Sequence, residues 1–213
     1  MIKVVHEFLP RPLFDYLKSV VEHESEMFWN FNARNLQDDN KSSGGEQFKF
    51  GRTLFVHSNL TWAGKEIYDK ELMPLFGVFK SFIEKYMQDK CKPSKMIRMK
   101  LNLYPNQGTN VKHGVHNDIQ INDRPRPDIV TSVFNFNTCN GSTIFYEKDE
   151  DGNFSDKSKK VEVPSIENSI VIFNNTHPHY GITQSDTPAR IVLNTNIEKH
   201  NTNDNDKPID DYF

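Results

Sequence analysis

Hydrophobic residues follow a helical period in the first part of this chain. After Pro12, apolar side chains recur at helical spacing, at Leu13, Phe14, Leu17, Val20 and Val21. They predict one amphipathic helix, which ends where polar residues begin at His23. A second helical region is predicted from Trp62 to Asp89, interrupted near Pro74. Its broad aromatic face is assigned to core packing rather than to a cofactor site.

Two segments between these helices break the pattern. Residues 48 to 56 predict a strand. Residues 34 to 47 lack apolar periodicity and contain two serines followed by two glycines, which predicts a mobile surface loop. Such a loop is either a tolerated insertion or a lid over a site.

From Met96 the period changes to two. The odd positions from Ile97 to Leu103 are apolar and are expected to face the helices, which turns Asn102 and Tyr104 toward the other side. Further strands are predicted at 129–137, 142–146, 160–163, 169–174 and 190–197, joined by turn-rich segments such as Asn140-Gly141. Short strands without intervening helices predict an antiparallel sandwich or barrel, whose polar inner face lines a cavity.

The whole chain of 213 residues suits one domain, 1–213. We expect mainly helical support over 1–95, a β core over 96–198 and a loosely docked polar tail over 199–213. Residues 147–156 only partly match a calcium-binding loop, because position twelve is Ser158 instead of Glu, so they predict a solvated hairpin loop.

Composition narrows the function classes. A net charge of −3 shows no basic excess, which argues against a dedicated nucleic-acid binder. The two cysteines, Cys91 and Cys139, are too few for a disulfide scaffold. No apolar run reaches membrane-spanning length and the first residues lack a signal-peptide pattern, so we expect a cytoplasmic protein without membrane contact.

The candidate chemistry begins at His116 and Asp118. Residues two apart on a strand point the same way, so both could bind one ion; a surface ion pair is the alternative. His177 and His179 follow the apolar strand 169–174. Two histidines and one carboxylate leave half of an ion's coordination sphere open, the arrangement typical of non-haem Fe(II) oxygenases.

Arg190 begins the last predicted strand, eleven residues after His179. Its guanidinium can bind a carboxylate in bidentate fashion, or it can form a structural salt bridge. Asn194 shares its strand face, and strand parity also places Asn135 and Thr131 toward the cavity.

The run from about 98 to 197 resembles the 2-oxoglutarate/Fe(II)-dependent oxygenase superfamily, in particular small prolyl-4-hydroxylase-like members of the kind found in bacteriophages. Residues matching the motifs of that family occur in its order, over about half the chain: Tyr104, His116, Asp118, Gly141, Thr143, Phe145, His179, Gly181, Arg190 and Asn194. The resemblance implies a double-stranded β-helix, or jelly roll, packed against the N-terminal α-helices.

The resemblance also implies roles. His116, Asp118 and His179 would bind Fe(II), and Arg190, assisted by Tyr104, would bind 2-oxoglutarate as cosubstrate. His179 fits the H-x-G motif better than His177, which would then lie next to the metal ligands without binding the metal itself. The implied reaction consumes O2 and 2-oxoglutarate, with ascorbate as a stimulant, and hydroxylates a protein or peptide residue such as proline.

Several alternatives stay open at this point. The same site could act on a free amino acid or another small molecule. Two alternatives belong to other functional classes: a non-catalytic jelly-roll binding module and a zinc hydrolase. Arg190 argues against both, because neither needs a cation that binds a dicarboxylate. Two departures bear on the substrate: collagen-type prolyl hydroxylases place Lys where Arg190 stands, and nucleic-acid repair dioxygenases carry a second Arg where this chain has Asn196.

Overall fold

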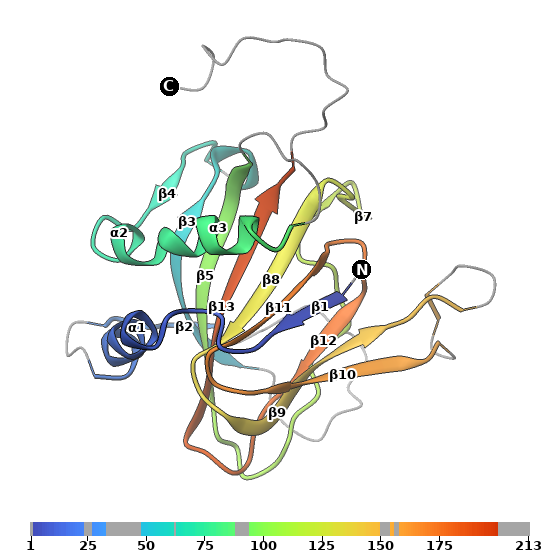
Figure 1. Cartoon of the computed structure of the whole chain (residues 1–213). Coiled ribbons are helices and arrows are strands. Elements are labelled where there is room, and N and C mark those ends of the chain that lie inside the picture. Colours follow the sequence, from blue (N-terminus) through green and yellow to red (C-terminus); the bar gives the residue numbers. More distant parts are fainter. Residues whose placement is uncertain are drawn as a thin grey trace.

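Two facing antiparallel sheets form the body of the protein (Figure 1). The computed structural model describes residues 2–23, 27–32, 48–61, 63–87, 94–149, 154–155 and 158–199. The predicted loop 34–47 lies outside these residues, and so do the predicted tail after residue 199 and part of the loop 147–156.

The larger sheet has eight strands among the described residues, in the order β1-β11-β8-β13-β5-β3-β2, with β4 paired to β3. Their bounds are β1 Ile2–Val5, β2 Asn30–Asn32, β3 Lys49–Val56, β4 Ile67–Tyr68, β5 Lys95–Pro105, β8 Ile129–Asn135, β11 Ser169–Asn174 and β13 Ala189–Glu198. All of these pairs are antiparallel. The long central strands β5 and β13 pair along their whole length and carry most of the polar residues discussed below.

The smaller sheet has the order β10-β9-β12, and a short hairpin joins β6 to β7. These strands span β6 Gln120–Ile121, β7 Arg124–Pro125, β9 Cys139–Tyr146, β10 Lys160–Ser165 and β12 His179–Ile182. A buried cluster with members from both sheets, including Val133, Phe145 and Phe173, fills the space between them. The predicted antiparallel sandwich is thus confirmed.

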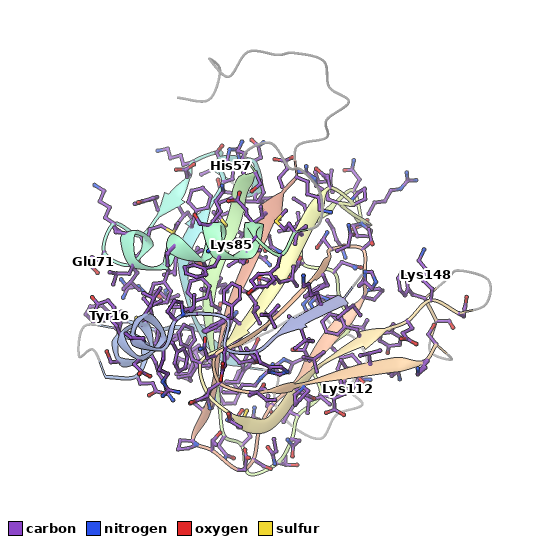
Figure 2. The ribbon with its side chains drawn as sticks, in the orientation of Figure 1. Tyr16, His57, Glu71, Lys85, Lys112 and Lys148 are labelled. Atoms are coloured by element: carbon purple, nitrogen blue, oxygen red, sulfur yellow. The ribbon has the colours of Figure 1, made fainter. Side chains whose placement is uncertain are left out.

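Helices cover the other face of the larger sheet (Figure 1). They are α1 Arg11–His23, α2 Met73–Phe76 and α3 Val78–Glu84, with a 3-10 turn at Ser58–Leu60. Their aromatic and aliphatic side chains form the main core with β5, β8 and β13, and sticks crowd this layer in Figure 2. Phe134 on β8 packs edge-to-face on Phe79 of α3. No helix within the described ranges combines the length and apolar character needed to cross a bilayer.

Two details differ from the sequence predictions. The second helical region begins only at Met73, after the short strand β4, although its predicted interruption near Pro74 is present, at Gly77 between α2 and α3. Asn140-Gly141 lies inside β9, at a register shift against Pro164 and Ser165, and is therefore not a turn.

The apolar face of β5 also changes sides once. Met99 and Leu101 join the helix-facing core as predicted, but Ile97 packs with Ile119 and Ile129 in a separate cluster. A register shift where β13 passes from Asn196 to its next residue interrupts the alternation. Period-two patterns cannot reveal such a bulge, because the extra residue leaves the hydrophobic composition unchanged.

Candidate metal centre

His116, Asp118 and His179 converge between the two sheets. One ligand atom from each side chain lies within 4.8 Å of the other two. Nε2 of His116 is 3.8 Å from Oδ1 of Asp118, and Nε2 of His179 is 3.9 Å from Oδ2 of the same carboxylate. The predicted trio is therefore assembled in the structure.

Backbone contacts turn both imidazoles toward the same point. Nδ1 of His116 lies 3.0 Å from the carbonyl oxygen of Gly114, and Nδ1 of His179 lies 3.1 Å from that of His177. A proton on each Nδ1 makes these contacts hydrogen bonds and leaves a lone pair on each Nε2 for a metal ion. His116 and His179 also exchange backbone N–H···O bonds of 2.9 and 3.0 Å in an isolated β-bridge.

Asp118 lies outside any strand, so the strand-parity argument that paired it with His116 is not the reason for their proximity. Instead, Asn175 fixes the turn by accepting from the backbone N–H of Ile119 and donating to its carbonyl oxygen. Alternation along the sequence correctly suggested that His116 and Asp118 lie together. What holds Asp118 in place, however, is the side chain of Asn175, 57 residues later in the sequence.

Three side chains from the larger sheet bind the Asp118 carboxylate. Arg98 donates to Oδ1 at 2.9 Å, and Asn194 and Asn196 donate to Oδ2 at 3.1 and 3.4 Å. Burial alone would raise the pKa of Asp118, but Arg98 and the two histidines outweigh it, so the pKa lies well below its usual range. The carboxylate is thus held ionised, as a metal ligand must be.

The centre is open on one side. The side chains of Asp118 and His179 are 6% and 5% exposed, whereas that of His116 is 25% exposed. Burial, followed by the neighbouring His116, lowers the pKa of His179 to about 4, so this imidazole is neutral at physiological pH. Both features suit metal binding, because a neutral imidazole keeps its lone pair and the open side admits a ligand.

A buried guanidinium lies deeper between the sheets. Arg190 is 3% exposed and donates to the hydroxyls of Ser165 and Thr143 at 2.6 and 3.1 Å. Burial lowers its pKa, and within the described part of the chain no carboxylate forms an ion pair with it. A buried cation held only by neutral groups is ready to accept an anionic ligand.

Glycines make room for Arg190. A Cβ on Gly141 would lie 2.9 Å from the carbonyl oxygen of Ile182 and 3.0 Å from Cδ of Arg190. A Cβ on Gly181 would lie 3.4 Å from Nη1 of Arg190. Gly141 was expected to serve only a turn; its position in β9 instead allows the arginine to approach the small sheet.

Aromatic and basic residues surround this guanidinium. Tyr104 pairs with Arg190 across β5 and β13, and its ring centroid lies 6.0 Å from Cζ of Arg190. The ring of His113 is 5.0 Å from that of Tyr104, and Nζ of Lys49 is 5.6 Å from the Tyr104 ring. Burial, followed by Lys49 and Arg190, lowers the pKa of His113 to about 3, so this imidazole is neutral.

The remaining predicted residues occupy different places. Asn194 contacts Asp118 directly, and Thr131 accepts a hydrogen bond of 2.9 Å from Asn196. Asn135 is buried and donates to the hydroxyl of Ser169 instead. His177 lines a separate cavity of about 740 Å³ beside β1 and β10, while its carbonyl orients His179.

Sequence reasoning missed three contributors to this region. Arg98 and Lys49 stood in predicted strands as ordinary polar residues, and His113 is three residues before His116. A signal existed for Arg98, because it shares the polar face of β5 with Tyr104. Nothing local distinguishes Lys49, whose position depends on the pairing of β3 with β5.

Comparisons with known proteins agree with this geometry. No family model and no curated protein sequence matches the chain. Solved structures do: an oxidoreductase of the 2OG-Fe(II) oxygenase family from Burkholderia pseudomallei has a TM-score of 0.65 at 7% identity, covering 94% of this chain and 86% of that one. A prolyl-4-hydroxylase from Pseudomonas putida has a TM-score of 0.54 at 12% identity, with 94% and 93% covered.

A third similar structure contains ligands. HygX from Streptomyces hygroscopicus, solved with nickel, 2-oxoglutarate and hygromycin B, has a TM-score of 0.55 at 10% identity and covers 92% of this chain and 82% of its own. Identities this low speak to the fold. The chain therefore has the jelly-roll fold of the 2-oxoglutarate/Fe(II)-dependent oxygenases, prolyl hydroxylases among them, as the sequence predicted.

Proposed function

We propose that this protein is an Fe(II)- and 2-oxoglutarate-dependent dioxygenase that hydroxylates a C–H bond. The observation that carries the proposal is the combination of a two-histidine, one-carboxylate centre with a buried guanidinium between the same two sheets. The first binds a redox metal and leaves coordination positions open. The second binds a carboxylate.

The donor set fits iron(II). Both Nε2 atoms are oriented by bonded Nδ1 atoms, and the Asp118 carboxylate is ionised and held by Arg98 and two asparagines. A nitrogen and oxygen donor set without thiolates suits Fe(II) in an oxygenase. His116, Asp118 and His179 would hold the ion.

The distance to Arg190 fits 2-oxoglutarate. His179 and Gly181 are two residues apart on β12, which places them roughly 7 Å apart along the strand. A Cβ on Gly181 would touch the Arg190 guanidinium. A five-carbon dicarboxylate therefore has the length to bind the metal at one end and Arg190 at the other.

The bound groups supply the oxidising power: dioxygen and 2-oxoglutarate become succinate and CO2 as one C–H bond of the substrate becomes C–OH. The protein binds and orients. Arg190, with Thr143 and Ser165, receives the distal carboxylate, and Tyr104 covers it. The buried cluster around Phe145 and Phe173 keeps this end dry.

For the substrate, we propose a protein or peptide residue such as proline, with a free amino acid or another small molecule as the alternative. The first is supported by the prolyl-4-hydroxylase among similar structures, and the second by HygX, solved with hygromycin B. The open side at His116 is where either would approach.

Succinate release from 2-oxoglutarate with iron and ascorbate tests the proposal. We expect His116→Ala to lose metal and activity, and Arg190→Ala to lose mainly cosubstrate affinity. Arg124→Ala, at an exposed position of β7, serves as the control. Normal turnover by both site variants would overturn the assignment, and products about 16 Da heavier in mass spectra of candidate peptides would identify the substrate, since one oxygen atom is added.

A further inference from the structure

We propose that the polar inner face of the larger sheet binds a substrate carrying a negatively charged group, a carboxylate or a phosphate, through the ammonium groups of Lys49 and Lys100. This inference rests on the proposed function and deepens it, because it assigns a substrate class to the same site. It is carried by the position of the two lysines, the space made for them and the charges around them.

The two lysines belong to the inner, polar face of the larger sheet. Lys100 stands between Arg98 and Asn102 on the polar side of β5, the side that also presents Tyr104. Lys49 begins β3, and its Nζ lies 5.6 Å from the ring centroid of Tyr104. Both side chains therefore lie on the inner face of the larger sheet, the face that carries Tyr104.

A glycine makes room for them. Gly51 is two residues after Lys49 on β3, so a side chain there would project toward the same face. A Cβ on Gly51 would lie only 2.8 Å from Cε of Lys100. The Lys100 side chain thus extends across β3 at the one position that lacks a side chain, and it approaches Lys49 there.

Neither lysine forms an ion pair with a carboxylate in the part of the chain that the structure describes. Burial lowers the pKa of Lys49 to about 8, with Arg98 adding to the effect, and burial and Lys49 lower the pKa of Lys100 to about 8. At neutral pH both remain mostly protonated, so two like charges lie close to each other on the inner face of the sheet.

The cofactors do not compensate these charges. With iron(II) and 2-oxoglutarate bound, the positive charges are those of the metal, Arg98 and Arg190. The negative charges are those of Asp118 and the two cosubstrate carboxylates. The net charge of this set is one positive charge. Lys49 and Lys100 add two more. A half-buried excess of cations is costly unless an anion binds, and the substrate is the component not yet counted.

Lysine NMR can test this without knowing the substrate. Protein with 13C-methylated lysines is loaded with zinc in place of iron and saturated with 2-oxoglutarate, and then titrated separately with acetate and with inorganic phosphate. The signals of Lys49 and Lys100, assigned from Lys49→Arg and Lys100→Arg, are expected to shift and saturate. Those of the exposed Lys65 and Lys70 should not. A response to acetate alone or to phosphate alone distinguishes the two sources of charge.

Two results would overturn the inference. If neither anion moves the signals, the lysines do not form an anion site. If 2-oxoglutarate alone causes the whole shift and no second anion binds, the lysines serve the cosubstrate. In both cases zinc and 2-oxoglutarate still bind, so the proposed function survives; failure of 2-oxoglutarate to bind would instead refute that function.

Matched variants extend the test to turnover. The pair Lys49→Gln and Lys100→Gln should weaken anion binding about 10- to 100-fold, since each lost charge-assisted hydrogen bond is worth roughly a factor of ten or more. Any change in the KM for 2-oxoglutarate should be much smaller than the loss of anion affinity. The control pair Lys65→Gln and Lys70→Gln removes the same charge from the surface. A rise confined to the 2-oxoglutarate KM would contradict the proposal.

Discussion

Arg98 donates from Nη2 to Oδ1 of Asp118 at 2.9 Å, so a cation binds the carboxylate of the candidate metal centre. The same guanidinium contacts the Asn194 and Asn196 side-chain oxygens, and these amides donate to the other oxygen of Asp118. A network of this kind fixes the carboxylate in one orientation before any metal arrives.

Replacing Arg98 should therefore weaken metal binding. We expect Arg98→Met to lower the affinity for Fe(II) or Zn(II) about 10- to 100-fold, because Asp118 loses its orienting donor and its ionised form becomes less favourable. Anaerobic calorimetric titration measures this, with Arg124→Met on the surface as the control. Equal or higher affinity would show that repulsion between Arg98 and the metal outweighs orientation.

Arg190 variants should separate cosubstrate binding from metal binding. Arg190→Met should weaken 2-oxoglutarate binding by about 100-fold, since a buried charge-assisted pair is lost. Arg190→Lys should fall between, because an ammonium cannot form the bidentate contact. Metal affinity should be unchanged in both. Tight 2-oxoglutarate binding by Arg190→Met would place the distal carboxylate elsewhere.

The two glycines beside Arg190 offer a matched comparison. Gly141→Ala puts a Cβ 2.9 Å from a backbone carbonyl, so either β9 or β12 must move; we expect a loss of about 1–3 kcal/mol in unfolding free energy and weaker 2-oxoglutarate binding. The Cβ of Gly181→Ala would lie 3.4 Å from its nearest atom, so the losses of stability and of cosubstrate binding should be smaller. Chemical denaturation with cosubstrate titration distinguishes them, and equal effects would contradict the steric explanation.

Lys49 and Lys100 should reduce stability near neutral pH. Their pKa falls from 10.5 to about 8 on folding, so between these values the unfolded chain binds more protons and stability rises with pH. Below pH 8 the cost is complete, at most about 3 kcal/mol per lysine. Lys49→Met or Lys100→Met should therefore stabilise the protein at pH 7 and lose this gain toward pH 10.5. Denaturation across that range tests the sign.

Much of the fold follows from alternation along the chain. The strands carrying Leu101, Phe134, Ile172 and Leu193 were predicted because each has a regular apolar face against one core. β12 was missed because it has only four residues, one of them Gly181. The helical region from 62 was overestimated because apolar side chains in β4 and its turns fit a helical face equally well.

His116, Asp118 and His179 come together as the sequence predicted, and Arg190 is buried between the same two sheets, whereas His177 lines another cavity. Their roles as metal and cosubstrate ligands stay predictions. Arg98 could have been found from the face of β5 that it shares with Tyr104, but His113 and Lys49 could not be foreseen, because their proximity depends on which strands pair and in which register. Pairing between distant segments leaves no trace in local spacing.

The mutual backbone bonds between His116 and His179 link metal capture to folding order. These residues are 63 positions apart, so during synthesis the second imidazole leaves the ribosome long after the first. A nascent chain that ends before β12 has at most two of the three ligands and should bind iron poorly. Under the proposed function, a chain that has not yet docked β12 therefore lacks a complete set of metal ligands.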